Sequence, residues 1–131
     1  MTTLHKLTPN LMVESVDETL QFYRDVLGFT INATAPEERP FNWASLERDG
    51  VSFMFQSRES LAEELPAFQQ APLGASLTFF IFISDLEELY AQVKERAHIL
   101  KPPYTTFYNM REFVLSDNNG YLLVFAEEIK A

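Results

Sequence analysis

The chain of 131 residues contains no cysteine, only two histidines and only ten lysine and arginine residues. The absence of cysteine excludes disulfide bonds, thiolate metal sites and a cysteine nucleophile. No apolar run reaches the roughly 18 residues of a membrane-spanning helix, and the opening MTTLHKLTPN lacks the apolar stretch of a signal peptide. We therefore expect a cytoplasmic protein that has no membrane as partner.

Basic residues are outnumbered by nineteen aspartate and glutamate residues, which gives a formal net charge of −9. This balance argues against nucleic acid as a partner, because the phosphate backbone attracts basic surfaces. The acidity has two interpretations: it keeps the protein in solution, or it attracts a cationic ligand. The length and the 47% apolar content predict a single domain over residues 1–131.

The pattern of apolar residues predicts the same series of elements twice. Ser15 and Glu18 have the spacing of a capping box, and Gly28 stands where a helix would stop, which predicts a helix over 16–27. Asp49-Gly50 and Asn119-Gly120 are typical of two-residue hairpin turns. Strands are predicted at 6–13, 29–35, 41–48, 51–57, 76–83, 111–117 and 121–127, with a second helix at 84–97 and an extended segment at 98–104.

The two hairpin turns lie 70 residues apart, and the same offset relates Val13 to Ile83 at the two strand-to-helix junctions. One offset therefore aligns both ends of a βαβββ unit, which predicts an internal repeat. We expect an α+β fold with module one at 4–57, a polar connector at 58–74 and module two at 75–128.

Two stretches carry a resemblance to a known family. LTPNLMVESVDETLQFYRDVLGF resembles the opening of the vicinal oxygen chelate superfamily, which includes glyoxalase I, extradiol dioxygenases, fosfomycin resistance enzymes and bleomycin resistance proteins. FVLSDNNGYLLVFAEE resembles the closing signature of that superfamily, an Asp-Pro-Asp-Gly turn that leads into the last strand. The resemblance implies two βαβββ modules that form a cup-shaped mixed sheet, usually completed in a homodimer.

In metal-dependent members of the superfamily, four strand positions carry histidine or glutamate ligands. The resemblance places those positions at Thr8, Met54, Thr78 and Val124. None of these side chains is a usual ligand, because divalent metals in catalytic sites need imidazole nitrogen or carboxylate oxygen. His5 and His98 are the histidines of the chain, and neither falls at such a position. We therefore expect no metal, no other cofactor and no catalytic residue of the chelating type.

Strand alternation predicts which side chains face the cup. In the first strand Leu7 is predicted to face the helix, and Asn10 the cup. Pairing across the second hairpin, taken as a two-residue turn, places Arg111, Phe113 and Leu115 in the cup. The Pro-led aromatic loop 102–110 is expected to edge it. The predicted ligand-binding residues are Trp43, Phe80, Phe82, Tyr104, Phe107, Tyr108, Arg111, Phe113, Asn10 and Gln56.

This residue set favours a non-enzymatic protein, similar to the metal-free bleomycin resistance branch, that sequesters a small aromatic molecule in a dimer cleft. Aromatic rings and negative charge suit a cationic ligand such as an antibiotic. Arg111 opposes a cation unless Glu128 pairs with it, and a neutral or anionic aromatic metabolite is the alternative. A superfamily enzyme, metal-dependent through another register or metal-free, is a second hypothesis. A third is a structural or regulatory dimer whose own side chains fill the cup.

Overall fold

The computed structural model describes residues 1–74 and 76–130, and the chain divides into two compact units, Met1–Ala71 and Pro72–Ala131. Ala75, the predicted first residue of module two, lies outside the described residues. Each unit is built around one four-stranded sheet. Among the described helices, none is long and apolar enough to cross a membrane.

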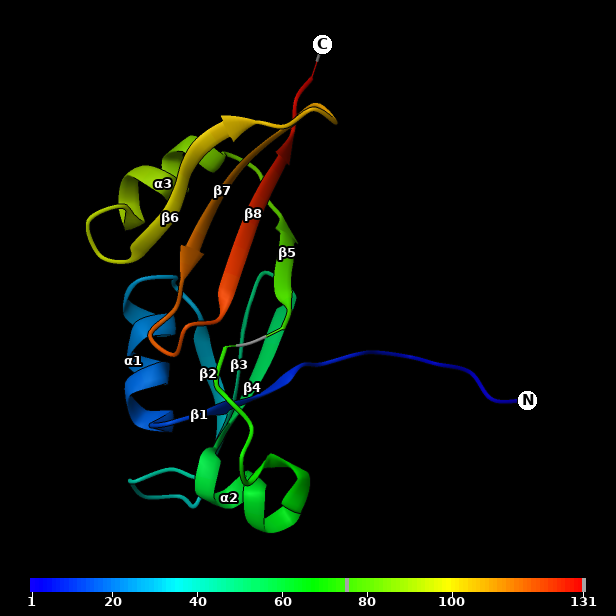
Figure 1. The fold of residues 1–131 in the computed structure, drawn as a ribbon, viewed down its shortest axis with the longest axis vertical. Coiled ribbons are helices and arrows are strands. Elements are labelled where there is room, and N and C mark those ends of the chain that lie inside the picture. Colours follow the sequence, from blue (N-terminus) through cyan, green and yellow to red (C-terminus); the bar gives the residue numbers. More distant parts are fainter. Residues whose placement is uncertain (75, 131) are drawn as a thin grey trace. The chain divides into compact units, whose positions relative to one another are not determined.

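The first unit is a mixed sheet with a helix against one face (Figure 1). Its elements are β1 (Asn10–Val13), α1 (Val16–Asp25), β2 (Thr30–Ala35), β3 (Trp43–Arg48), β4 (Val51–Ser57), α2 (Arg58–Glu64) and the 3-10 turn η1 (Pro66–Phe68). The strand order is β1-β4-β3-β2, with β1 parallel to β4 and the other pairs antiparallel. Both α2 and η1 lie in the segment 58–74, for which the sequence predicted a polar connector.

The second unit repeats this topology. Its elements are β5 (Thr78–Phe82), α3 (Leu86–Val93), β6 (His98–Thr105), β7 (Met110–Ser116) and β8 (Leu122–Glu128). The strand order β5-β8-β7-β6 matches that of the first sheet, and the parallel pairs Asn10–Met54 and Phe80–Val124 are related by the offset of 70. The predicted α+β fold of two βαβββ modules is therefore confirmed.

Local sequence explains why α1 begins and ends where it does. The Ser15 side chain accepts a hydrogen bond from the Glu18 N–H at 3.1 Å, which satisfies one of the amides exposed at a helix start. The helix ends at Asp25, two residues earlier than predicted. Gly28 follows with φ +73°, and its N–H donates to the Arg24 carbonyl at 3.1 Å, which is the bond of an αL helix cap.

An aromatic cluster holds each helix on its sheet. Tyr23 of α1 is fully buried, with its ring centroid 4.8 Å from that of Phe55 and 5.7 Å from that of Phe53. In the second unit the ring of Tyr90 lies 5.3 Å from that of Phe113. Such pairs contribute about 0.5–1.5 kcal/mol each beyond the burial of their area. These contacts identify the helix-covered face of each sheet, and we call the opposite face the distal face.

The first strand is shorter than predicted. β1 begins at Asn10, and Leu7, which was predicted to face the helix, is exposed. Pro9 has no N–H to donate to a sheet, although its carbonyl still accepts from the Met54 N–H at 2.8 Å. Thr8 therefore precedes the strand to which the sequence assigned it.

The second hairpin also differs from the prediction, by one residue in register. Ser116 pairs with Leu122, so residues 117–121 form the turn, where a two-residue turn was expected. Asp117 organises this turn, because its Oδ1 accepts hydrogen bonds from the N–H groups of Asn119 at 2.8 Å and Tyr121 at 2.9 Å. A shift of one residue moves every side chain of β7 to the other face of the sheet.

Candidate ligand-binding site

The distal face of the second sheet carries a row of four side chains, one on each strand. Phe82 pairs with Ala126, Ala126 with Glu112, and Glu112 with Tyr104. Paired residues on neighbouring strands point to the same face. The next row along the sheet contains Phe80, Val124, Val114 and Lys101.

Glu112 is the polar centre of this face. Its side chain is buried, with 2% of the residue exposed, and both oxygens accept hydrogen bonds. The Tyr108 hydroxyl donates to Oε2 at 2.6 Å, and the Tyr104 hydroxyl donates to Oε1 at 3.3 Å. A buried carboxylate is costly unless such donors replace water, and the two phenols supply them. The hydrogen bond to Glu112 also raises the pKa of Tyr108 above its ordinary value.

Tyr108 reaches Glu112 from the turn between β6 and β7. The Thr106 N–H donates to the Met110 carbonyl at 2.8 Å, and the Met110 N–H donates to the Thr106 hydroxyl at 3.0 Å. These bonds close the turn, so that Tyr108 and Glu112 lie within hydrogen-bonding distance. Phe107, at the tip, is fully exposed and packs edge-on against Tyr108 with 5.0 Å between ring centroids.

Aromatic surface is exposed at the other end of the two rows. Phe80 is 46% and Phe82 70% exposed, and their rings meet edge to face with 5.2 Å between centroids. Ala126, whose side chain is a single methyl group, separates Phe82 from Glu112. The distal face therefore exposes two apolar rings next to a buried carboxylate.

Lys101 places a positive charge on the same face. It pairs with Val114, and its ammonium lies 4.4 Å from the centroid of the Tyr104 ring, in a cation–π arrangement. The Lys101 side chain is exposed to solvent. The Glu112 carboxylate is buried and accepts hydrogen bonds from the Tyr104 and Tyr108 hydroxyls.

Three residues predicted to face the cup, Arg111, Phe113 and Leu115, lie on the helix-covered face. Phe113 is fully buried, between Tyr90 of α3 and Phe125 of β8. Arg111 forms an ion pair with Glu87 of α3 at 2.9 Å. The one-residue register shift places both here, with Leu115, and brings Glu112 and Val114 to the distal face in their stead. The aspartate in SDNNG, which favours a longer turn, was the available signal.

The distal face of the first sheet gathers three of the predicted residues. Asn10 donates from Nδ2 to Gln56 Oε1 at 2.9 Å, and Gln56 donates from Nε2 to Ser60 Oγ at 3.0 Å. Trp43, which pairs with Gln56, is half-buried on the same face, and Ser45 pairs with Met54 beside it. The two amide side chains therefore bond to each other and to Ser60 of α2, and fewer of their donors and acceptors remain for a ligand.

The four positions of the family ligands do not fit a metal. Met54 and Val124 lie on the distal faces, Thr78 begins β5, and Thr8 precedes β1. None has an imidazole or carboxylate group. Across residues 1–74 and 76–130, no group of three or more histidine, cysteine, aspartate or glutamate side chains is arranged to hold a metal ion.

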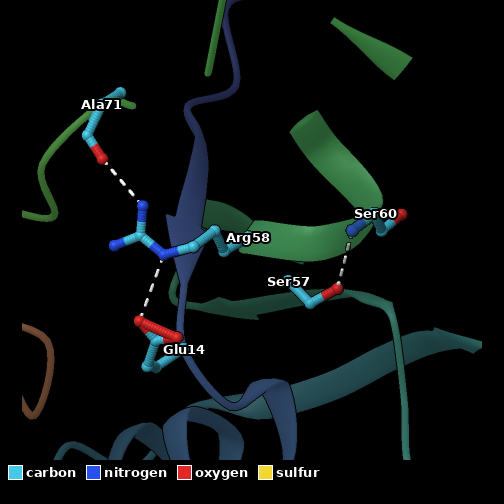
Figure 2. A network of polar contacts seen from close by, with 5 residues as sticks. All are labelled: Glu14, Ser57, Arg58, Ser60 and Ala71. Atoms are coloured by element: carbon cyan, nitrogen blue, oxygen red, sulfur yellow. Dashed lines mark hydrogen bonds and ion pairs between the residues drawn. The ribbon is translucent and has the colours of Figure 1, made fainter. Parts of the chain in front are cut away.

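A separate depression of about 690 Å³ lies in the first unit. It is lined by Glu14, Ser57, Arg58, Glu59, Ala62, Glu63 and Gln69. Figure 2 shows Arg58 stretched between two partners, with Nε 3.2 Å from Glu14 Oε1 and Nη1 2.8 Å from the Ala71 carbonyl oxygen. Arg58 thus ties the end of the connector to the strand–helix junction after β1.

Comparison with known proteins supplies the family. The family model of the glyoxalase/bleomycin resistance protein/dioxygenase superfamily matches residues 3–125. The chain belongs to this superfamily. No curated protein matches the sequence. The superfamily resemblance of the two quoted stretches is thereby confirmed, without a particular branch.

Solved structures of superfamily proteins share the fold at low sequence identity. A glyoxalase/bleomycin resistance protein/dioxygenase from Nocardioides has a TM-score of 0.81 at 17% identity, covering 100% of this chain and 88% of that one. A glyoxalase/bleomycin resistance protein/dioxygenase family enzyme from Burkholderia phytofirmans PsJN has a TM-score of 0.77 at 17% identity, and the match covers 93% of this chain and 97% of that one. TioX from Micromonospora sp. ML1 has a TM-score of 0.75 at 17% identity, and the match covers 95% of this chain and 99% of that one.

Proposed function

We propose that this superfamily member is a binding protein that sequesters a small aromatic molecule on the distal face of the second sheet. The observation that carries the proposal is the exposure of Phe80 and Phe82 beside the buried Glu112 and its two phenols. Small-molecule sites are mostly apolar, with a few fixed polar groups that orient the ligand. Two exposed rings and one anchored carboxylate have this composition.

The second sheet is favoured over the first because its polar group is anchored beside exposed apolar surface. On the first sheet, Asn10 and Gln56 are engaged with each other and with Ser60. On the second, Phe82 leaves most of its ring to solvent, at 70% exposure. An aromatic ligand that covers such a ring gains about 0.5–1.5 kcal/mol per ring pair beyond area burial.

Binding is favoured over catalysis by the state of the tyrosine at this face. Tyr108 donates to Glu112, and this hydrogen bond raises the pKa of Tyr108. An efficient general acid or base needs a pKa near the working pH, and the phenol is moved further from it. Thr8, Met54, Thr78 and Val124, at the positions of the family's metal ligands, also lack the imidazole or carboxylate groups that a metal-assisted step would need.

The proposal includes the homodimer that the family resemblance implies. Exposed apolar side chains support it, because large apolar groups at a surface mark interaction sites. Phe107 is fully exposed, and Leu4 and Leu7 are also exposed in the segment before β1. Sedimentation velocity over a range of protein concentrations tests this part, and a monomer at all concentrations would remove the dimer from the proposal.

The binding proposal is tested by ligand-observed NMR with a set of two-ring aromatic molecules. We expect Phe82→Ala to weaken binding roughly 3- to 10-fold, the loss of one ring contact. Phe68→Ala is the matched control, because it removes a phenylalanine from η1 in the first unit. Equal affinity in both variants would contradict the assignment to this face. Turnover of a bound molecule would replace binding with an enzymatic function.

A further inference from the structure

The distal face of the first sheet differs in chemistry from that of the second. Two rows of paired side chains cross its four strands: Asn10, Met54, Ser45 and Ala33 in one row, and Met12, Gln56, Trp43 and Ala35 in the other. None of these eight side chains is charged. An ion that leaves water is costly unless an opposite charge pairs with it, so these rows are complementary to a neutral molecule.

Asn10 is held on this face by a chain of hydrogen bonds. Its Nδ2 donates to Gln56 Oε1 at 2.9 Å, and Gln56 donates from Nε2 to Ser60 Oγ at 3.0 Å. Gln56 is buried, with 7% of the residue exposed. A buried amide that is bonded at both ends is fixed in orientation, and it fixes the direction of the Asn10 side chain in turn.

The exposed Asn10 side chain keeps one donor and one acceptor for a ligand. A carboxamide has two donor hydrogens and an acceptor oxygen, and the bond to Gln56 uses one of the hydrogens. Within residues 1–74 and 76–130, the second hydrogen and Oδ1 have no protein partner. Such a group is complementary to a ring edge that carries an acceptor and a donor, which is how asparagine reads the edge of a base.

Trp43 supplies a flat surface at a matching distance. Strands β1 and β3 are separated by β4, so the backbones at Asn10 and Trp43 are roughly 12 Å apart. That span holds one or two fused rings over Met54, which is half-buried between them and whose thioether packs well against aromatic rings. Ala33 and Ala35 are exposed on β2 and carry only methyl groups, which leaves room beside the indole.

We propose that the distal face of the first sheet binds a neutral planar heterocycle with an N–H beside a carbonyl group, that is a lactam or an imide. Its ring lies on Trp43 and Met54, and its polar edge bonds to the Asn10 carboxamide. This inference goes beyond the proposed function, because it places a second site on the other sheet and gives it an uncharged ligand. Gln56 is a positioning residue that acts through Asn10.

NMR titration with matched probes tests the ligand class. The chain has one tryptophan, so a single indole N–H signal reports on this face. Quinolin-2-one carries the lactam edge, its N-methyl derivative lacks the N–H, and 4-methylquinolin-2-one keeps the N–H and controls for the added methyl group. All three are neutral. We expect both N–H lactams to shift the Trp43 signal and to bind about five- to tenfold more tightly than the N-methyl probe.

Variants assign this preference to residues. Asn10→Ala should lower the affinity for quinolin-2-one to that of the N-methyl probe. Asn32→Ala is the matched control, because it removes the same side chain from an exposed position on β2. Gln56→Leu should weaken the two N–H lactams and leave the N-methyl probe unchanged, a selective loss that general damage to the fold would not produce.

The outcomes separate this site from the one on the second sheet. Equal affinity of the lactam and N-methyl probes for the wild type overturns the ligand class, and this comparison needs no variant. A Trp43 signal that no probe shifts overturns the site. Phe82→Ala should leave the titration unchanged, because this ring belongs to the second sheet. Loss of lactam binding in that variant would place the probe there and overturn the inference.

Discussion

The Tyr108 hydroxyl lies 2.6 Å from Oε2 of Glu112, four residues further along the chain and across a turn. This contact joins a half-exposed aromatic side chain to a buried carboxylate. It also fixes the direction in which Tyr108 titrates, because the phenol loses a charge-assisted hydrogen bond when it loses its proton.

Alkaline titration of the tyrosines tests this contact. The pKa of Tyr108 is raised above 10.0 in the folded state, chiefly by the hydrogen bond to Glu112. The stabilisation it gives is present below the unfolded pKa and is lost as pH rises through the folded pKa. Phenolate absorbance of wild type minus Tyr108→Phe isolates this residue. The same subtraction is then made with Glu112→Gln in both proteins. The titration of Tyr108 should move to lower pH, and an unchanged titration would contradict the contact.

The register of β7 is tested by a pair of phenylalanine substitutions. Phe113→Ala removes a fully buried ring and should lower the free energy of unfolding by about 3–5 kcal/mol. Phe82→Ala removes an exposed ring and should change it by no more than about 0.5 kcal/mol. Urea denaturation measures both. A larger loss in Phe82→Ala would mean that the helix-covered and distal faces are assigned the wrong way round.

Acid stability should depend on Glu127, whose carboxylate accepts from the N–H groups of Leu86 at 3.0 Å and Asp85 at 2.9 Å at the start of α3. These bonds, that of Leu86 first, lower the pKa of Glu127 below 4.5. Because the folded pKa is depressed, the stabilisation is present above the unfolded pKa and is lost as pH falls through the folded pKa.

The corresponding experiment compares Glu127→Gln with Glu128→Gln, an exposed neighbour. At neutral pH the first variant should be less stable than wild type and the second nearly unchanged. Below about pH 4 the difference in free energy of unfolding between wild type and Glu127→Gln should become smaller, because the native carboxylate takes up a proton. A difference that does not depend on pH would show that the charge of Glu127 does not contribute to stability.

Arg58 should restrain the connector more than it stabilises the fold. Its ion pair with Glu14 is partly exposed, with 34% and 66% of the side chains accessible, and is worth less than about 1 kcal/mol. Arg58→Lys keeps the charge but loses the fork that reaches both Glu14 and the Ala71 carbonyl. Hydrogen exchange of residues 66–71 should therefore quicken, and Arg96→Lys, at an exposed position, should leave it unchanged.

Metal content provides a direct check on the four family positions. After incubation with zinc, nickel, manganese or iron(II) and removal of the excess, we expect no metal near one per chain. The reason is that Thr8, Met54, Thr78 and Val124 offer neither imidazole nor carboxylate. Elemental analysis measures this, and one retained metal per chain would require ligands from other strand positions.

Local patterns were sufficient wherever a single segment decides its own structure. The capping contact of Ser15 formed as its spacing indicated, and Asp49-Gly50 gave the two-residue turn that pairs Arg48 with Val51. Phe53 and Phe55, two residues apart on β4, both lie against Tyr23 of α1, as strand alternation requires. These features depend on residues within a few positions of each other, so the sequence by itself carries their physical cause.

The same patterns failed where one residue of turn length mattered. Asn119-Gly120 suggested a two-residue turn, but Asp117 draws the N–H groups of Asn119 and Tyr121 into a longer one. Because strand side chains alternate with a period of two, this moved Phe113 to the helix side and Glu112 to the distal face.

The sequence thus determined the order of elements, the repeat and the superfamily, because each follows from local spacing of apolar, turn and capping residues. Tertiary structure decided which side chains of β7 share a face with Phe82, and it brought Tyr104 and Tyr108 onto Glu112. Pairing between strands and closure of a turn over a buried carboxylate depend on the balance of hydrogen bonds across segments, which no single stretch of the chain contains.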